Sequence, residues 1–129
     1  MQIFEKLITV TQDDLDELNH VNNVRYVKWV NDIAKDHWLQ NTTEAIRNDF
    51  FWVLLNHKIE YKNPAVLNDI VKLTTYITKS GGVTCTRIVE VYNQKTQKLL
   101  ASSETNWCLV SCKTQRPTRI NQEIANLFN

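Results

Sequence analysis

Glycine, proline and cysteine are scarce in this chain, which has two, two and three of them among 129 residues. A chain of this length suits one compact domain and leaves little room for a second. Hydrophobic residues make up 43% of the chain and charged residues 22%, which is close to the usual globular mixture. Because such a chain can bury a core, its composition excludes a disordered tail. We therefore expect a single domain over residues 1–129.

An excess of charge of either sign is also absent. Fifteen Lys and Arg residues stand against fourteen Asp and Glu, and the net charge of +1 does not indicate a nucleic-acid-binding protein. The longest strongly apolar run, residues 50–55, is far shorter than the roughly 20 residues that cross a bilayer. The opening MQIFEKL lacks the charged start and apolar stretch of a signal peptide. We expect a soluble, cytoplasmic protein without membrane insertion.

The three cysteines fit that compartment, since an odd number does not form a disulfide framework. Cys108 and Cys112 are four residues apart on a predicted strand, which sets their sulfurs roughly 13 Å apart. No CxxC or HxxxH spacing suggests a metal site. His37 and His57 have no recognisable partners, so both are expected to be ordinary helix or strand residues.

Hydrophobic periodicity predicts a strand, a long helix, four strands and a short helix. Residues 3–10 favour a strand because they are rich in apolar and β-branched types. From Asn23 to about Leu39 apolar residues recur at three- and four-residue steps, which indicates a helix with Asn22 as its N-cap. After a polar connection over 41–49, extended segments follow at about 51–62, 69–79, 83–93 and 98–111. Hairpin turns are expected at 80–82 and 93–97, and a short closing helix after Pro117.

This order is typical of an α+β fold in which one antiparallel sheet covers one helix. Trp29 and Trp38 make the helix bulky. A helix that is apolar around much of its circumference is best buried by a curved sheet wrapped around it. The sheet still has a second face and free edges, which favours pairing with another copy of the chain.

The segment Asp13–Trp29, DDLDELNHVNNVRYVKW, gathers acidic residues, a His and three Asn immediately before the predicted helix. The first turn of a helix offers unpaired N–H groups and about half a positive charge. It can therefore bind an anion or stabilise an oxyanion that develops during acyl transfer. A carboxylate a few residues upstream could face the same carbonyl group.

The strongest motif in this segment reads D-x-D-x-x-x-H-V-N-N-x-x-Y and consists of Asp14, Asp16, His20, Val21, Asn22, Asn23 and Tyr26. It resembles the signature of hotdog-fold acyl-CoA thioesterases of the 4-hydroxybenzoyl-CoA thioesterase type, and plant acyl-acyl-carrier-protein thioesterases have a similar run. The later phrase IEYKNPAVLNDIVKLTTYITKSGGVTCTRIVEVYN resembles the second half of that family. The resemblance covers roughly residues 3–112 and implies one hotdog domain, an antiparallel sheet wrapped around one long central helix.

The resemblance also implies roles for these residues. Asp16 becomes the catalytic carboxylate, as nucleophile or as general base for the hydrolytic water, and Asp14 becomes a structural acid. The backbone N–H of Asn23 polarises the thioester carbonyl, which agrees with its predicted place at the helix start. His20 orients the reacting group or stabilises charge. The substrate-binding residues are expected to be Asn22, Tyr26 and Glu60.

The sequence departs from the plant-type pattern at two positions, and it leaves structural roles open for several residues. Leu18 and Tyr61 stand where that pattern has Asn and Cys, whereas His20 and Glu60 match it. Asp16 can instead accept loop N–H groups. Structural roles are equally open for four residues: a loop-fixing bond for His20, a helix cap for Asn22, a packing role for Tyr26 and a solvated charge for Glu60. The basic residues Lys113, Arg116 and Arg119 can meet the phosphates of coenzyme A or remain solvated.

We expect a thioesterase that hydrolyses an acyl-CoA to free acid and coenzyme A without a metal or an organic cofactor. A second hypothesis is the same reaction on an acyl-acyl-carrier-protein, and a third is a non-catalytic hotdog protein that binds acyl-CoA. The resemblance further implies a homodimer or homotetramer, with the site at a subunit boundary.

Overall fold

Five strands form one antiparallel sheet in the order β1-β3-β4-β5-β2. The computed structural model describes all 129 residues. Along the chain the elements are β1 (Phe4–Thr9), the 3-10 turn η1 (Gln12–Asp14), α1 (Asn23–Asn41), α2 (Glu44–Asp49), β2 (Phe50–Tyr61), β3 (Ile70–Gly81), β4 (Thr84–Asn93), β5 (Leu99–Ser111) and α3 (Gln122–Asn126). The predicted long helix and all five strands are confirmed, and so is the short closing helix.

The connection before β2 differs from its prediction. Residues 44–49 form the short helix α2, where the sequence predicts only a polar connection. The side chain of Thr43 caps this helix by accepting a hydrogen bond from Ile46 N, and Glu44 lies in its first turn. Both are ordinary signals of a helix start. The helix was not predicted because the prediction relied on apolar periodicity. Residues 44–49 bury no side chain and therefore show no such periodicity.

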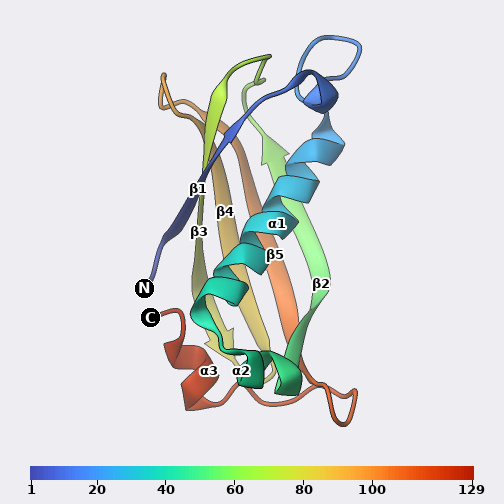
Figure 1. Ribbon diagram of the computed structural model, residues 1–129, viewed down its shortest axis with the longest axis vertical. Coiled ribbons are helices and arrows are strands. Elements are labelled where there is room, and N and C mark those ends of the chain that lie inside the picture. The colour runs from blue at the N-terminus through green and yellow to red at the C-terminus, as the bar shows by residue number, and fades with distance from the viewer.

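Helix α1 lies diagonally across one face of the sheet, as Figure 1 shows. Its residues Trp29, Val30 and Ile33 are buried against apolar side chains of the sheet, which include Val71, Leu73, Val89, Val91, Leu100 and Ala101. The bulky face of the helix is therefore covered by the sheet. This is the α+β arrangement that the element order predicts.

Both predicted hairpin turns are present, but the first lies at 82–83 and not at 80–82, because Ser80 and Gly81 still pair within β3. Gly81 pairs with Thr84, so that Gly82 and Val83 form the turn between β3 and β4. Gly82 has a φ of +61°, which a residue without a Cβ adopts without steric cost. The second turn joins β4 to β5, and Gln97 N donates to Asn93 O there at 2.8 Å.

The two ends of the sheet carry different elements (Figure 1). The start of α1 lies at the end where β2 finishes, and the Tyr61 hydroxyl donates to Asn23 O at 3.3 Å. The last part of α1, α2, α3 and the β3–β4 hairpin gather at the opposite end, where Ile120 N donates to Gly82 O at 2.8 Å. No helix has the length and hydropathy that crossing a bilayer requires.

Candidate active site

A five-residue loop precedes the start of α1. Leu15 and Val21 form an isolated antiparallel bridge, and Asp16 N donates to His20 O at 2.8 Å. Asn19 takes a φ of +60°, a left-handed conformation that Asn tolerates better than most residues. Asn22 N also donates to Asp14 O at 2.8 Å. These contacts hold both ends of the 16–20 loop against the helix start.

The Asp16 carboxylate is engaged through one oxygen only. Its Oδ1 accepts hydrogen bonds from Leu18 N at 2.9 Å and from His20 N at 3.2 Å. The structural role that the sequence left open for Asp16, acceptance of loop N–H groups, is therefore confirmed for this oxygen. Oδ2 makes no hydrogen bond and no ion pair within the chain. The loop thus orients the carboxylate and leaves one oxygen free for a ligand.

The first turn of α1 leaves one backbone amide without an acceptor. Asn22 caps the helix, because its Oδ1 accepts from Val24 N at 2.9 Å and its carbonyl accepts from Arg25 N at 2.9 Å. The predicted N-cap is confirmed. The Asn23 N–H donates no hydrogen bond within the chain, so the positive end of the helix presents this amide to a ligand.

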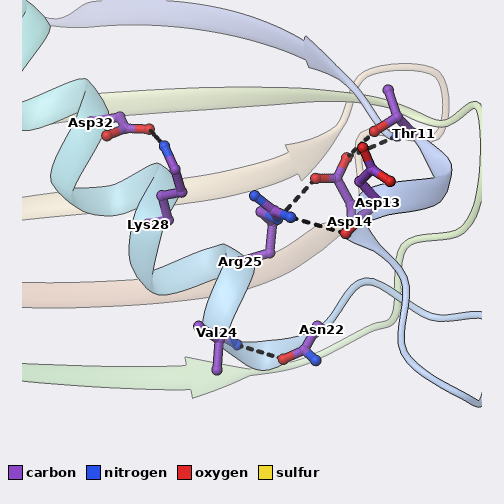
Figure 2. Close-up of polar contacts among 8 residues, drawn as sticks. All are labelled: Thr11, Asp13, Asp14, Asn22, Val24, Arg25, Lys28 and Asp32. Atoms are coloured by element: carbon purple, nitrogen blue, oxygen red, sulfur yellow. Dashed lines mark hydrogen bonds and ion pairs between the residues drawn. The ribbon is translucent and has the colours of Figure 1, made fainter.

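Asp14 and Arg25 brace this helix start, as Figure 2 shows. Arg25 Nε lies 3.0 Å from Asp14 Oδ1, and Arg25 Nη2 donates to Asp13 O at 2.9 Å. The other Asp14 oxygen accepts from Thr11 N at 2.8 Å and from the Thr11 hydroxyl at 3.2 Å. Asp14 is buried and both of its oxygens have partners, which fits the structural role implied for it. The part that Arg25 plays was not found in the sequence.

His20 and Tyr26 lie in different surroundings. The His20 side chain is exposed and its imidazole makes no hydrogen bond within the chain. Tyr26 is buried, with its ring against Trp29 at 5.3 Å and against Tyr61 at 5.5 Å between centroids. Burial raises the pKa of the Tyr26 phenol to about 12, so the hydroxyl stays protonated at neutral pH. Within one chain, the side chain of Tyr26 therefore has a packing role against Trp29 and Tyr61.

Tyr61 is a link that sequence reasoning missed. The sequence marks it only as a departure from the plant-type pattern, yet it joins the end of β2 to the start of α1 through Tyr26 and Asn23. An aromatic residue at the end of a strand was the only signal. Strand geometry alone does not show which helix turn such a residue will meet.

The remaining predicted residues lie away from the helix start. Glu60 is exposed and pairs with Lys62 at 3.1 Å and Lys58 at 3.8 Å, and these lysines lower the pKa of its carboxyl. Tyr61 turns toward α1, and Glu60, the preceding residue on β2, points to the other face of the sheet. Three basic residues follow β5 at the opposite end of the sheet: Lys113, Arg116 and Arg119.

Two hollows of different size lie along α1. The smaller, of about 250 Å³, lies beside the helix start and is lined by Asp13, Leu15, Asn22, Val24, Arg25 and Lys28. The larger, of about 770 Å³, lies at the other end of α1, away from the predicted catalytic residues. Size alone would favour the larger one as the active site, whereas the free amide and free carboxylate oxygen favour the helix start. No three His, Cys, Asp or Glu side chains come together as metal ligands would.

Comparison with known proteins gives concordant matches. A family model described as the thioesterase-like superfamily matches residues 10–128. The long-chain acyl-CoA thioesterase FadM of Escherichia coli (strain K12) is 24% identical over 113 residues, which cover 85% of each chain. The acyl-[acyl-carrier-protein] hydrolase FATB3, chloroplastic, of Cuphea viscosissima is 25% identical over 91 residues, which cover 67% of this chain and 22% of that protein.

The fold also matches solved structures. The crystal structure of a 4-hydroxybenzoyl CoA thioesterase mutant complexed with 4-hydroxybenzoyl CoA superimposes with a TM-score of 0.89 at 8% identity and covers 100% of both chains. At this identity the likeness concerns the fold. The hotdog fold expected from the motif is confirmed.

Proposed function

The chain belongs to the thioesterase-like superfamily, and on that premise we propose that it hydrolyses an acyl-CoA thioester to a free carboxylic acid and coenzyme A. The observation that carries the proposal is the Asn23 N–H without an acceptor at the start of α1, beside a loop that leaves one Asp16 oxygen free. The relative FadM, named as a long-chain acyl-CoA thioesterase, supports a fatty acyl-CoA substrate and a part in fatty acid metabolism. A cytoplasmic location, which the three free thiols fit, belongs to the same proposal.

In the proposed reaction the Asn23 N–H donates to the thioester carbonyl oxygen. One such donor to a developing oxyanion accelerates acyl transfer by roughly 100- to 1,000-fold. Asp16 Oδ2 then adds to the carbonyl carbon and expels the coenzyme A thiolate, which leaves a mixed anhydride for water to cleave. Alternatively, it removes a proton from the water that attacks the carbonyl. Both routes need the carboxylate that the loop orients.

His20 is the proposed partner of Asp16 in orienting the carboxylate or the water. Its backbone is already tied to Asp16 on both sides of the loop, by Asp16 N to His20 O and by His20 N to Asp16 Oδ1. Asn22 and Tyr26 support substrate binding by holding the start of α1 and its contact with Tyr61. Substrate binding by Glu60 stays a prediction, since its contacts within the chain are with lysines.

The activity is tested by thiol release from a series of acyl-CoA substrates with short, medium, long and aromatic acyl groups. Measurable turnover of at least one class is expected. Ligand-induced stabilisation without release of coenzyme A from any of them would instead favour the non-catalytic binding protein. The relative FATB3 keeps acyl carrier protein open as the carrier. Comparing kcat/KM for one acyl chain on both carriers separates the two enzymes.

The free edge of β2 carries the proposal of a homodimer. β2 has twelve residues and pairs with β5 on one side only, and Val53, Leu54 and Leu55 are 41%, 36% and 53% exposed. A long apolar edge strand is a template for pairing with a second chain. Because Tyr61 at the end of β2 touches the Asn23 carbonyl, a partner on this edge would lie close to the catalytic residues.

The outer face of the sheet favours a dimer over a tetramer. It carries a polar cluster in which the hydroxyls of Tyr76 and Tyr92 donate to Glu90 at 3.3 and 3.1 Å.

Light scattering after size exclusion tests the β2 interface. The variant Leu55→Lys should shift the mass toward the monomer and lower activity, whereas Leu7→Lys on the β1 edge should leave the mass unchanged. An unaltered mass for Leu55→Lys would exclude β2 as the interface.

A further inference from the structure

The larger hollow lies between the last part of α1, the start of β2, the β3–β4 hairpin and α3. At about 770 Å³ it falls within the range of roughly 300 to 1,000 Å³ that is usual for small-molecule sites. Its walls are largely aromatic and apolar, with Trp38, Phe51, Trp52, Ile77, Trp107 and Phe128 among them. Such walls favour a ligand with an apolar body.

All the charged side chains that line this cavity are cationic. They are Lys35, Lys79 and Arg87, and neither Asp nor Glu lines the cavity. Lys35 and Lys79 are exposed, whereas the Arg87 side chain is buried, with 5% of the residue exposed. The cavity therefore has positive charge at its solvent side and in its wall, and no acidic side chain of the lining balances it.

The Arg87 guanidinium is hydrogen-bonded only to neutral groups. Its Nη1 lies 2.9 Å from His37 Nδ1 and 2.9 Å from the Thr75 hydroxyl, and the Phe128 ring lies 5.6 Å away. Its Nε and Nη2 make no hydrogen bond within the chain, and no carboxylate forms an ion pair with it. Isolated buried charges are costly, and proteins usually pair them.

His37 does not compensate this charge. The contact with Arg87 Nη1 requires Nδ1 to act as an acceptor, so the ring proton sits on Nε2, which lies 2.6 Å from Gln2 Oε1. Burial, together with the Arg87 charge, lowers the pKa of the His37 imidazole to about 4. The ring is therefore neutral at neutral pH, and it fixes the guanidinium without cancelling its charge.

We propose that this cavity binds a monocarboxylate with an apolar body, whose carboxylate pairs with Nε and Nη2 of Arg87. The planar guanidinium suits a carboxylate because two parallel N–H donors meet its two oxygens. The aromatic walls take the rest of the ligand, and Lys35 and Lys79 attract the anion to the cavity. The site goes beyond the proposed function: within one chain it borders α1 from Asn31 to Trp38, about 12 to 22 Å along the helix from Asn23 at 1.5 Å per residue, and it requires no thioester.

Tryptophan fluorescence is a direct readout, since three of the four tryptophans line the cavity. The ligands are octanoate, 1-octanol and octylamine, which share one chain length and differ in the charge of the head group. We expect octanoate to bind about tenfold more tightly than octanol, and octylamine to bind most weakly. Equal affinities for octanoate and octanol, or no octanoate binding at millimolar concentration, would overturn the proposal.

Two variants separate the head group from the cavity. Arg87→Met should remove the preference for octanoate over octanol, whereas Arg87→Lys, which keeps the charge, should retain part of it. Ala125→Trp, placed on α3 at the cavity wall, should weaken both ligands together. Circular dichroism confirms that each variant is folded. If Arg87→Met does not fold, the octanoate preference of Arg87→Lys decides: a preference as large as in the wild type or none at all contradicts guanidinium pairing.

A further variant keeps this proposal distinct from the proposed function. Asp16→Asn lies at the other end of α1 and should leave octanoate binding unchanged while it lowers thioester turnover. Loss of octanoate binding in Asp16→Asn would contradict a separate site. If the wild type binds octanoate but has no thioesterase activity, the thioesterase proposal is refuted and the proposal of the carboxylate site stands.

Discussion

The two ends of α1 differ in what they offer a ligand. At its first turn the protein presents a small hollow lined mainly by polar residues, with one free amide and one free carboxylate oxygen beside it. Near its last turns the protein has a larger, mainly apolar cavity with a buried guanidinium and no acidic side chain. The first end has the groups to which the proposed reaction assigns polarisation and attack of the carbonyl, and the second has the groups of the proposed binding site.

Solvent exposure explains much of this difference. The Asp14–Arg25 pair at the helix start is partly exposed, with side chains 11% and 31% accessible, and each ion has its counterion. Arg87 is more deeply buried and lacks one. Because burial strengthens electrostatic interactions, an anion that reaches Arg87 gains more than one that reaches an exposed lysine.

Asp16→Asn should abolish most of the activity at the helix start. Removing a general base or nucleophile is expected to lower kcat by about 100- to 10,000-fold, measured as thiol release. The matched control is Asp13→Asn, which changes an exposed acid of the same segment and should leave kcat within about twofold. An unchanged kcat in Asp16→Asn would remove this residue from the mechanism.

Low pH should decrease the free energy of unfolding through His37, which lies at the cavity end of α1. His37 has a pKa of about 4 in the folded chain and an ordinary value of 6.5 when unfolded. Between these values the unfolded chain binds a proton that the folded chain does not, so stability decreases as the pH falls through this window. The full effect is about 3 kcal/mol.

Urea unfolding of the wild type and of His37→Gln, followed from neutral pH down to about pH 4, isolates this contribution. The Gln side chain can still accept from Arg87 and donate to Gln2, but it does not titrate. The difference between the two proteins in unfolding free energy should change across the window. A constant difference would show that His37 titrates alike in both states.

Asp14→Ala should destabilise the helix start. The substitution removes the ion pair with Arg25 and two hydrogen bonds from Thr11. Charge-assisted bonds at a buried carboxylate are worth about 1.5 to 3 kcal/mol, so urea unfolding should show a loss of about 2 kcal/mol. If Asp14→Ala instead lost turnover at unchanged stability, Asp14 and not Asp16 would be the reacting acid.

Asn22→Ala should have a smaller effect, because it removes one cap hydrogen bond to Val24 N. Loss of such a cap costs about 1 kcal/mol of unfolding free energy. Asn22→Asp is the matched control, since its carboxylate accepts the same bond and also favours the helix N-terminus. Equal thermal stability of the Ala and Asp variants would show that the cap contributes little.

Local patterns predicted most of the elements but not every one. The period of α1 and the extended segments placed the long helix and the strands close to their observed bounds. Helix α2 was not predicted, because its six residues bury no side chain and therefore lack an apolar face. The cap at Asn22 was predictable because an N-cap contacts only its own helix turn.

The residues of the candidate site were likewise predictable only where they lie close together in the sequence. Asp16, His20 and Asn23 lie within eight residues, so one sequence motif identifies all three as candidates. Contacts over longer separations leave no such local signal. His37 was expected to be an ordinary helix residue, yet it meets Arg87, fifty positions away, and Gln2, thirty-five positions away.

The order of the long helix and the strands, the thioesterase motif and the unpaired amide at the start of α1 could all be predicted from the amino-acid order, because they depend on neighbours within one helix turn or one strand. The burial of the Arg87 guanidinium without an acidic side chain as partner and the contact of Tyr61 with the helix start emerge only when the chain is folded. The physical reason is that a side chain's charge is known from its type, whereas its desolvation and its partners depend on which distant segments the sheet brings against the helix.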